Sequence, residues 1–298
     1  MDKRKFHRLL LKFRFNSKSA ATAPGQIMAG GKKIPVFANE FWTPRQRQAH
    51  SIHEVSYRAC FKPQLPRFFI DIFTEPGNLV YDPFNGRGTT VVEAALMGRN
   101  VIANDVNPLS LILARPRVSP PLLADVEKRL QSIKFKQGLK ADIDLSMFYE
   151  KATLSEIVSL REYLKKRVKK GLEDDVDRWI RMVATNRLSG HSKGFFSVYT
   201  LPPNQAMSAP RQKKINKQRK QKPEYRDVKA LIWKKSKALM RDLETENKNQ
   251  VKAIYLDSDA AQTKKIKSNT VTLTVTSPPF LDVIQYAADN WLRCWFND

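Results

Sequence analysis

The chain has 298 residues, of which 42% are hydrophobic, and its 53 Lys and Arg against 29 Asp and Glu give a formal net charge of +24. The hydrophobic content excludes a disordered tail, and the sequence holds neither an apolar run long enough to span a membrane nor a secretory signal. A charge of this size predicts a polyanionic partner, with nucleic acid favoured over a merely basic surface, and we expect a cytoplasmic, nucleoid-associated protein.

The N-terminal part changes character near residue 40. Residues 1–39 are basic, rich in Ser, Ala and Gly, and without a sustained hydrophobic period, which predicts a flexible arm. Residues 40–118 alternate between helical and extended patterns. The expected elements are a helix in KPQLPRFFIDIFTEP, a strand in NLVYD, a helix in TTVVEAALMG and a strand in NVIAND. This order is typical of a βαβ unit and forms the first part of an α/β domain.

The rest of the chain divides into a helical part, 119–250, and a part that returns to strands, 251–298. Helices are expected at 122–137, 153–170, 173–188 and 226–247. The later strands are expected in VKAIYLDSD and NTVTLTVTS, before a helix in LDVIQYAADNWLRCWF. The sequence therefore predicts a parallel α/β sheet with a helical insertion, and the insertion is the expected recognition region.

A glycine-rich loop, DPFNGRGTT, follows the first strand and opens a helix. Gly86 and Gly88 allow the backbone to approach a ligand closely, while the helix N-terminus directs amide groups at it. Asp105 ends the next strand about twenty residues on, where a carboxylate can accept both hydroxyls of a ribose. Asp259 ends a later strand and suits an adenine amino group. Capping of the following helix is the alternative role for either carboxylate.

The loop also limits the kind of cofactor. A dinucleotide enzyme needs a third spaced glycine, which is absent here, and no Gly-Lys-Ser/Thr follows to make a P-loop. Asp82, at the start of the loop, suits a cationic ligand better than a pyrophosphate. S-adenosylmethionine carries a sulfonium, an ammonium group and a ribosyl adenine, so it matches acidic residues at several strand ends.

A second motif, TSPPF, ends the last expected strand. The two prolines cannot donate to a ladder and fix their own φ, so the segment from Ser277 to Phe280 is expected to form a rigid turn. A proline-terminated edge strand with no further function is the alternative. The cofactor proposal requires this turn and the glycine loop to lie side by side at neighbouring strand ends.

Together these motifs resemble the amino-group DNA methyltransferases, which modify the exocyclic nitrogen of cytosine or adenine. DPFNGRGTT is similar to their cofactor loop DPFxGxGTT, FKPQLPRFFI to the segment that closes over the methionine end of the cofactor, and TSPPF to their catalytic [DNS]PP[YFW] motif. The resemblance covers residues 50–117 and 253–296 and implies a Rossmann-like class I methyltransferase sheet. It implies cofactor binding by Asp82, Phe84, Gly86, Gly88, Thr89, Asp105 and Asp259, and catalysis by Ser277, Pro278, Pro279 and Phe280.

The resemblance implies a site-specific DNA methyltransferase of a restriction-modification system, and the serine form of the motif favours cytosine N4. The Ser277 hydroxyl and the Pro278 carbonyl would accept the hydrogens of the amine, and Phe280 would stack on a base flipped out of the duplex. Adenine N6, an RNA substrate, and a truncated homologue that binds cofactor and nucleic acid without transferring methyl groups stay open.

The positions of the two cysteines argue against carbon-5 methylation of cytosine, a disulfide framework and a metal site. Methylation at ring carbon five of cytosine needs a Pro-Cys pair, which neither Cys60 nor Cys294 provides. The cysteines also lie far apart, in no CxxC or Cys/His cluster, and the four histidines are scattered. Neither a disulfide framework nor a metal site is therefore expected.

Within the insertion, residues 209–227 concentrate positive charge between prolines that disfavour one continuous helix. A solvated basic linker is one interpretation, and binding of DNA phosphates is the favoured one. The phosphate-binding candidates are Arg211, Lys213, Lys214, Lys217, Arg219 and Lys220. Candidates for contacts with bases are Asn186, Arg187, His191, Lys193 and Asn204.

The predicted sheet is incomplete at its C-terminal end, because the sequence after Pro279 has room for one helix and little more, whereas the family's sheet has further strands. Three explanations are open: the chain is a fragment of a longer enzyme, a second chain supplies the missing segment, or activity has been lost. Each of them leaves a sheet edge that favours association.

Overall fold

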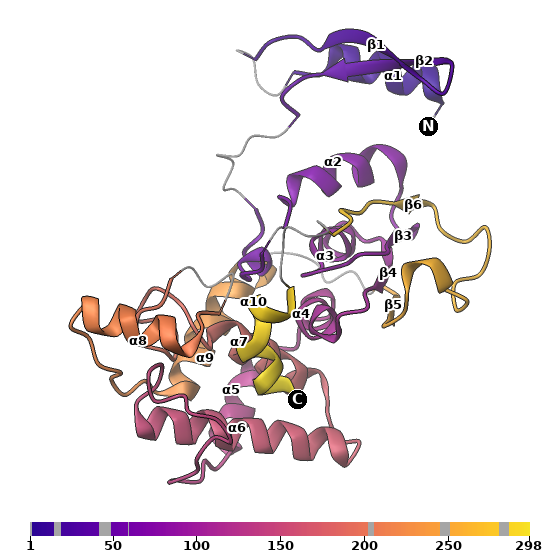
Figure 1. Ribbon diagram of the computed structural model, residues 1–298. Helices are drawn as coiled ribbons and strands as arrows, with labels where there is room; N and C mark the ends of the chain where they lie inside the picture. Colours follow the sequence, from indigo (N-terminus) through magenta and orange to yellow (C-terminus); the bar gives the residue numbers. More distant parts are fainter. Residues whose placement is uncertain are drawn as a thin grey trace.

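The computed structural model describes residues 2–14, 19–41, 49–58, 60–201, 206–244, 251–279 and 286–298. In these ranges the chain forms a parallel sheet with helices packed on it, a helical insertion, and a small N-terminal module that lies at the far end from the insertion (Figure 1). Among the helices of the described ranges, none is long and apolar enough to cross a membrane.

A parallel sheet forms the centre of the α/β part. Its strands are β3 (Leu79–Asp82), β4 (Asn100–Asn104), β5 (Ala253–Leu256) and β6 (Leu273–Thr274), in the order β5-β4-β3-β6. Every pairing is parallel, so the carboxyl ends of neighbouring strands meet at the same edge of the sheet. The predicted Rossmann-like α/β sheet is confirmed, and the two strands that carry the sequence motifs, β3 and β6, are direct neighbours.

Apolar strands and amphipathic helices build the core around this sheet. Val80 of β3 and Val101 of β4 are fully buried, as their unbroken apolar runs predict for a parallel sheet. The helices of this part are α2 (Gln64–Phe73), α3 (Thr89–Leu96) and α4 (Pro108–Val118). The start of α4 is fixed because the Asn107 side chain accepts a hydrogen bond from the Leu109 amide at 3.1 Å. This cap places Asn107 just beyond the end of β4.

The insertion is helical, as predicted. It contains α5 (Leu123–Ser132), α6 (Lys151–Lys169), α7 (Asp175–Arg187), α8 (Ala209–Gln218) and α9 (Val228–Met240). The fully buried Trp179 of α7 donates to the Ser236 hydroxyl of α9 at 2.9 Å, and α7 also packs against α4. The insertion is therefore joined to the α/β part through its buried helix α7. The remaining elements are η1 (Ser51–His53), η2 (Arg241–Glu244), η3 (Ala260–Gln262) and α10 (Tyr286–Asn297).

Helix α8 differs from the sequence-based expectation that prolines would prevent a continuous helix in the basic segment. Pro210 lies in the first turn, where its missing amide hydrogen would have no partner in any helix, so it does not interrupt α8. The buried Gln212 fixes the helix through hydrogen bonds to the Tyr199 carbonyl and to Asn216. The basic side chains consequently project from a regular helix.

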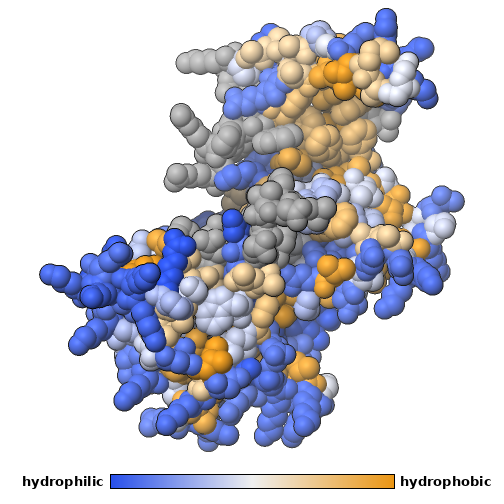
Figure 2. All heavy atoms as spheres, in the orientation of Figure 1, coloured by the Kyte–Doolittle hydropathy of each residue, from blue (hydrophilic) through white to orange (hydrophobic). Residues whose placement is uncertain are grey.

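The N-terminal segment also differs from the flexible arm that we expected. It forms α1 (Lys3–Lys12) and an antiparallel hairpin of β1 (Ala23–Ala29) and β2 (Lys32–Ala38). Aromatic side chains dock this module on α2, with the rings of Phe6 and Phe73 4.7 Å apart and those of Phe13 and Phe68 5.4 Å apart. Figure 2 shows apolar surface continuing from the module toward the sheet. These tertiary contacts stabilise a segment whose own sequence period is weak.

Candidate functional site

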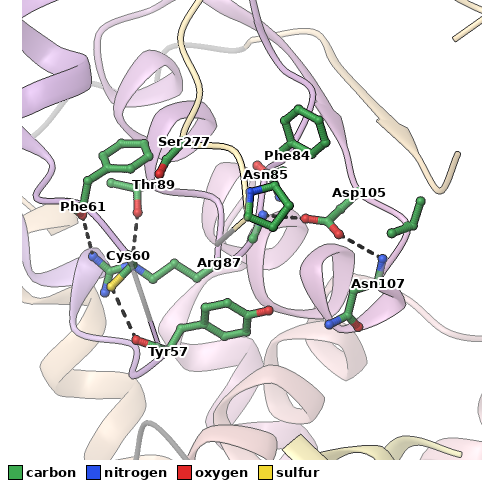
Figure 3. Close-up of a pocket in the computed structure, with 13 residues that line it drawn as sticks. Tyr57, Cys60, Phe61, Phe84, Asn85, Arg87, Thr89, Asp105, Asn107 and Ser277 are labelled. Carbon is green, nitrogen blue, oxygen red and sulfur yellow. Dashed lines mark hydrogen bonds between the residues drawn. The ribbon is translucent and has the colours of Figure 1, made fainter. Parts of the chain in front are cut away.

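A cavity of about 230 Å³ lies where the carboxyl ends of β3, β4 and β6 meet (Figure 3). It brings together the glycine loop, the end of β4 and the double-proline turn, which are far apart in the sequence. The sequence-predicted residues that line it are Phe84, Gly86, Thr89, Asp105, Ser277 and Pro279. The other lining residues are Tyr57, Cys60, Phe61, Asn85, Arg87, Val106 and Asn107. The two bends thus lie side by side, as the cofactor interpretation requires.

Asp105 connects the loop to the strand end. Its Oδ2 accepts the Gly86 amide hydrogen at 2.7 Å, and its Oδ1 accepts the Asn107 amide hydrogen at 2.9 Å (Figure 3). A carboxylate has about four acceptor positions, so each oxygen keeps capacity for a ligand hydroxyl. The geometry is that of a carboxylate positioned to accept hydrogen bonds from a diol.

The two glycines of the loop have different roles. Gly86 lines the cavity with a φ of +52°, so the left-handed backbone turns at the wall of the site. Gly88 does not line the cavity, although the resemblance of the loop implies cofactor binding by this residue. A Cβ built on Gly88 would lie 2.6 Å from Cβ of Ala114, so this glycine allows α3 to begin directly against α4. Its effect on the site is through packing.

Asp82 is also predicted to bind the cofactor, yet it is buried beneath the loop and does not line the cavity. Its Oδ1 accepts the Thr276 hydroxyl at 2.7 Å and the Phe84 amide hydrogen at 3.2 Å. The bond to Thr276 joins the glycine loop to the strand end that carries Ser277. Asp82 therefore acts as a positioning residue that sets the distance between the two motifs.

Burial raises the pKa of Asp82 to about 6, although the hydrogen bond from Thr276 lowers it. The folded protein thus binds this proton more tightly than the unfolded chain does. The contribution of Asp82 to the free energy of unfolding is fully present below the unfolded pKa, near 3.8, and is lost as the pH rises to about 6.

We expect Asp82→Asn to remove this pH dependence, because an amide oxygen can accept the same two hydrogen bonds without a buried charge. Above pH 6 the variant is expected to be more stable than the wild type by about 2 kcal/mol, and the difference should shrink toward pH 4. Urea unfolding at several pH values measures it. Asp71→Asn, at an exposed position of α2, is the matched control. A stability difference that stays constant across this pH range would contradict the assignment.

Two arginines hold the segment before α2 against the glycine loop. Arg87 donates to the Val55 carbonyl at 2.9 Å and to the Thr89 hydroxyl at 3.0 Å. Arg117 is fully buried and donates to the carbonyls of Leu113 and Arg87. Because burial outweighs all other effects, the pKa of Arg117 is lowered to about 9. These contacts position Tyr57 and Phe61 as a wall of the cavity. Phe61 begins FKPQLPRFFI, the segment that by resemblance closes over the cofactor, whereas no sequence signal indicated Tyr57.

Several predicted site residues lie elsewhere. Asp259 is exposed, does not line the cavity, and accepts the Ala261 amide hydrogen at 2.9 Å as the N-cap of η3, which is the capping alternative named for this carboxylate. Pro278 is exposed and does not line the cavity. Phe280 and Asn204 lie outside the described residues. Within the described ranges, no three His, Cys, Asp or Glu side chains cluster so that they could hold a metal ion.

The nucleic-acid candidates separate into two groups. The six basic residues of 211–220 are all exposed, on α8 and the turn after it. Asn186 is buried and exchanges hydrogen bonds with the backbone of Ser56, so its role is structural and not base contact. Arg187 and His191 line a second cleft beside the first cavity, whereas Lys193 is exposed outside both.

The fold and this cavity define a Rossmann-like methyltransferase domain, in which a ligand binds at the carboxyl ends of adjacent parallel strands. Residues 12–111 match the model of the N6 and N4 methyltransferase family, described as DNA methylase. Over these residues the chain is similar to the DNA amino-methyltransferases. The matched residues include the glycine loop and Asp105 but not the double-proline turn.

Two curated relatives are type II methyltransferases. The chain is 30% identical over 137 residues to the type II methyltransferase M.MjaII of Methanocaldococcus jannaschii, a match that covers 44% of this chain and 26% of the relative. It is 24% identical over 167 residues to the type II methyltransferase M.MvaI of Kocuria varians, covering 49% of this chain and 36% of the relative. The chain thus spans about a quarter to a third of the length of these relatives. No solved structure matches it significantly.

Proposed function

We propose that this chain provides the cofactor site and the target-base site of a site-specific DNA methyltransferase that acts on an exocyclic amine, with cytosine N4 favoured over adenine N6. The observation that carries the proposal is the single cavity lined by Gly86, Asp105 and Ser277. The serine of TSPPF supports cytosine N4, and the type II methyltransferase relatives support a role in restriction-modification.

The cavity residues fit S-adenosylmethionine. The carboxylate of Asp105 keeps acceptor positions for ribose hydroxyls, and the aromatic rings of Phe84 and Phe61 offer flat apolar surface for an adenine or a thioether chain. Gly86 lets the backbone approach the ligand closely. When bound, this cofactor supplies a methyl group carried on a sulfonium.

The chain's own residues would orient the acceptor amine. The lone pair of an exocyclic amine is delocalised into the ring, so hydrogen-bond acceptors on one side of the nitrogen are needed to favour a tetrahedral geometry. Ser277 lines the cavity, and its hydroxyl can accept one amine hydrogen. Pro278 does not line the cavity, so its carbonyl enters this proposal as the second acceptor through the motif alone. Phe280, the next aromatic in the motif, would stack on the flipped base, which recovers about 1–3 kcal/mol.

The direct test is methyl transfer by the whole protein. Purified protein is incubated with labelled S-adenosylmethionine and unmethylated DNA, and the DNA is digested to nucleosides. N4-methylcytosine supports the proposal, and N6-methyladenine supports its adenine form. A parallel reaction contains RNA in place of DNA. Transfer of the label to the RNA would mean that RNA is the substrate. No product from protein that still binds the cofactor would favour the second candidate, a homologue that binds cofactor and nucleic acid without catalysis.

Asp105→Ala is expected to weaken S-adenosylmethionine binding by about 30-fold, because a charged acceptor for the ribose is lost together with the anchor of the Gly86 amide. Isothermal titration calorimetry of the whole protein measures the change. Asp259→Ala is the matched control, since this carboxylate caps η3 outside the cavity and its loss should leave the affinity unchanged. Equal losses in both variants would contradict the separate roles assigned to the two carboxylates.

We also propose that α8 binds the DNA backbone. Replacing Arg211, Lys213, Lys214 and Lys217 with glutamine is expected to flatten the dependence of DNA affinity on salt, because each lost phosphate contact lowers the slope by about 0.9. The matched control replaces four exposed lysines around the β5–β6 connection, on the opposite side of the molecule in Figure 1, namely Lys252, Lys264, Lys265 and Lys267. An unchanged slope in the α8 variant would reject the helix as a phosphate contact.

A further inference from the structure

A second cleft, of about 440 Å³, adjoins the cofactor cavity. Residues 53–57, from the end of η1 onward, line it together with Arg187, His191, Phe195 and Lys235 of the insertion. Tyr57 and Arg87 line both the cleft and the cavity. A ligand in the cleft is therefore separated from the cofactor cavity only by this shared wall.

Arg187 is the most unusual residue of the cleft. It is 91% buried, its guanidinium lies 3.9 Å from the centre of the Phe195 ring, and its Nε donates to the Asn186 carbonyl at 3.1 Å. Among the described residues, no hydrogen-bond partner is found for its two terminal nitrogens. The stacking fixes the plane of the guanidinium. The N–H groups of its two terminal nitrogens therefore point in fixed directions, and no carboxylate of the described residues accepts from them.

Most of the charges around Arg187 are positive, and Glu54 compensates it only in part. Lys235 lines the same cleft, and Arg293, whose charge acts on Arg187, donates to the Ser56 carbonyl at 2.9 Å. Glu54 is the single carboxylate among the residues that line the cleft, and it contacts Lys235 at 3.1 Å and Arg241 at 3.8 Å. Burial and the neighbouring charge of Arg293 lower the pKa of Arg187 to about 10. The guanidinium stays charged at neutral pH in a site that an anion would stabilise.

We propose that this cleft binds a backbone phosphate of the target DNA strand, beside the nucleotide whose base enters the adjoining cavity. The inference rests on the proposed function. A planar guanidinium with two free nitrogens matches two oxygens of a phosphodiester, and Lys235 adds a point charge. A phosphate held here would pin the strand next to the flipped nucleotide, while the cations of α8 hold the duplex further along the insertion.

The test compares DNA binding by variants that remove charge but keep side-chain length. The double variant Arg187→Met and Lys235→Met is titrated with a fluorescein-labelled random-sequence duplex over a range of KCl concentrations. The salt slope is expected to fall by about 2, since each phosphate contact contributes about 0.9. Lys264→Met with Lys265→Met is the matched control, because these exposed lysines line neither the cleft nor the cavity, and it should keep the wild-type slope.

Two further measurements separate the possible outcomes. Thermal unfolding and S-adenosylmethionine binding should match the wild type in the double variant, which shows that the fold and cofactor cavity are intact. Should the double variant not fold, Arg187→Lys keeps the charge but loses the fork, and it is expected to lower DNA affinity several-fold at an unchanged salt slope. A double variant that folds but keeps the wild-type salt slope overturns the proposal. The proposal is also overturned if inorganic phosphate binds in the cleft while the substitutions leave DNA binding unchanged.

Failure of the proposed function gives a different pattern. If the double variant lowers the salt slope but the wild-type protein transfers no methyl groups, the phosphate site is supported and the proposed enzymatic function is rejected. If the wild-type protein transfers methyl groups but the double variant keeps the wild-type salt slope, the enzymatic function is supported and the phosphate site is rejected.

Discussion

Methyl transfer is expected to fall by about 100-fold to 1,000-fold when Ser277 is replaced with alanine, whereas the affinity for S-adenosylmethionine should stay within a few-fold of the wild type. Ser277 lines the cavity beside Pro279, and the Thr276 hydroxyl next to it keeps its bond to Asp82, so the turn itself should be preserved. The variant loses an acceptor for an amine hydrogen. This acceptor stabilises the transition state more strongly than the bound substrate, because the nitrogen becomes tetrahedral during transfer. Single-turnover transfer and calorimetric cofactor titration measure the two effects.

Thr276→Val provides the contrast to Ser277→Ala. It removes the hydroxyl that Asp82 accepts at 2.7 Å, so it should loosen the glycine loop and lower the cofactor affinity together with the rate. Undiminished transfer in Ser277→Ala would remove this serine from the mechanism. Equal loss of rate and cofactor affinity in Ser277→Ala would indicate a disturbed cavity instead of a missing acceptor.

Gly88→Ala is expected to lower the free energy of unfolding by about 3 kcal/mol. The φ of Gly88 is +86°, which costs an L-residue about 1–2 kcal/mol. The new Cβ would also lie 2.6 Å from Cβ and 3.2 Å from Cα of Ala114, and overpacking of this kind costs about 1–3 kcal/mol. Urea denaturation measures the change.

Gly77 is the matched control for this glycine. Its φ of +85° is almost the same, but nothing lies within 4 Å of a Cβ built on it, so Gly77→Ala should cost only the backbone strain, about 1 kcal/mol. Adding Ala114→Gly to Gly88→Ala should recover part of the loss, since it removes one of the two colliding methyl groups. If both glycine variants were destabilised equally, the contact with Ala114 would have no energetic role.

The sheet and the two motif loops could be predicted from the sequence because the signals for them are local. Short apolar runs such as NLVYD, bounded by turn residues, are typical of strands in a parallel sheet, and a glycine turn at the carboxyl end of a parallel strand lies at the edge where ligands bind. Asp105 was found in the same way, since it follows the strand next along the chain. The neighbouring position of β3 and β6 then brings Ser277 to the same edge.

The features that could not be predicted from the sequence are those that depend on tertiary packing. Asp259 also ends a strand, but the chain turns at once into η3, and the carboxylate caps that turn. The sequence predicts a ligand contact for Asp82, because the burial of this carboxylate has no sequence signal. Tyr57 and Phe61 reach the cavity only because Arg87 binds the backbone of their segment. The N-terminal module depends on contacts with Phe68 and Phe73 that are distant in sequence.

The two amide hydrogens that Asp105 accepts have a consequence for the kinetics of the site. Because these bonds hold the carboxylate and the glycine backbone to each other, a nucleoside bound as we propose would meet donors and acceptors at fixed positions. Little conformational entropy remains to be lost at that end of the cofactor, so more of its contact energy counts toward affinity. Association should therefore proceed in one phase at the ribose end, without a preceding slow rearrangement of the loop.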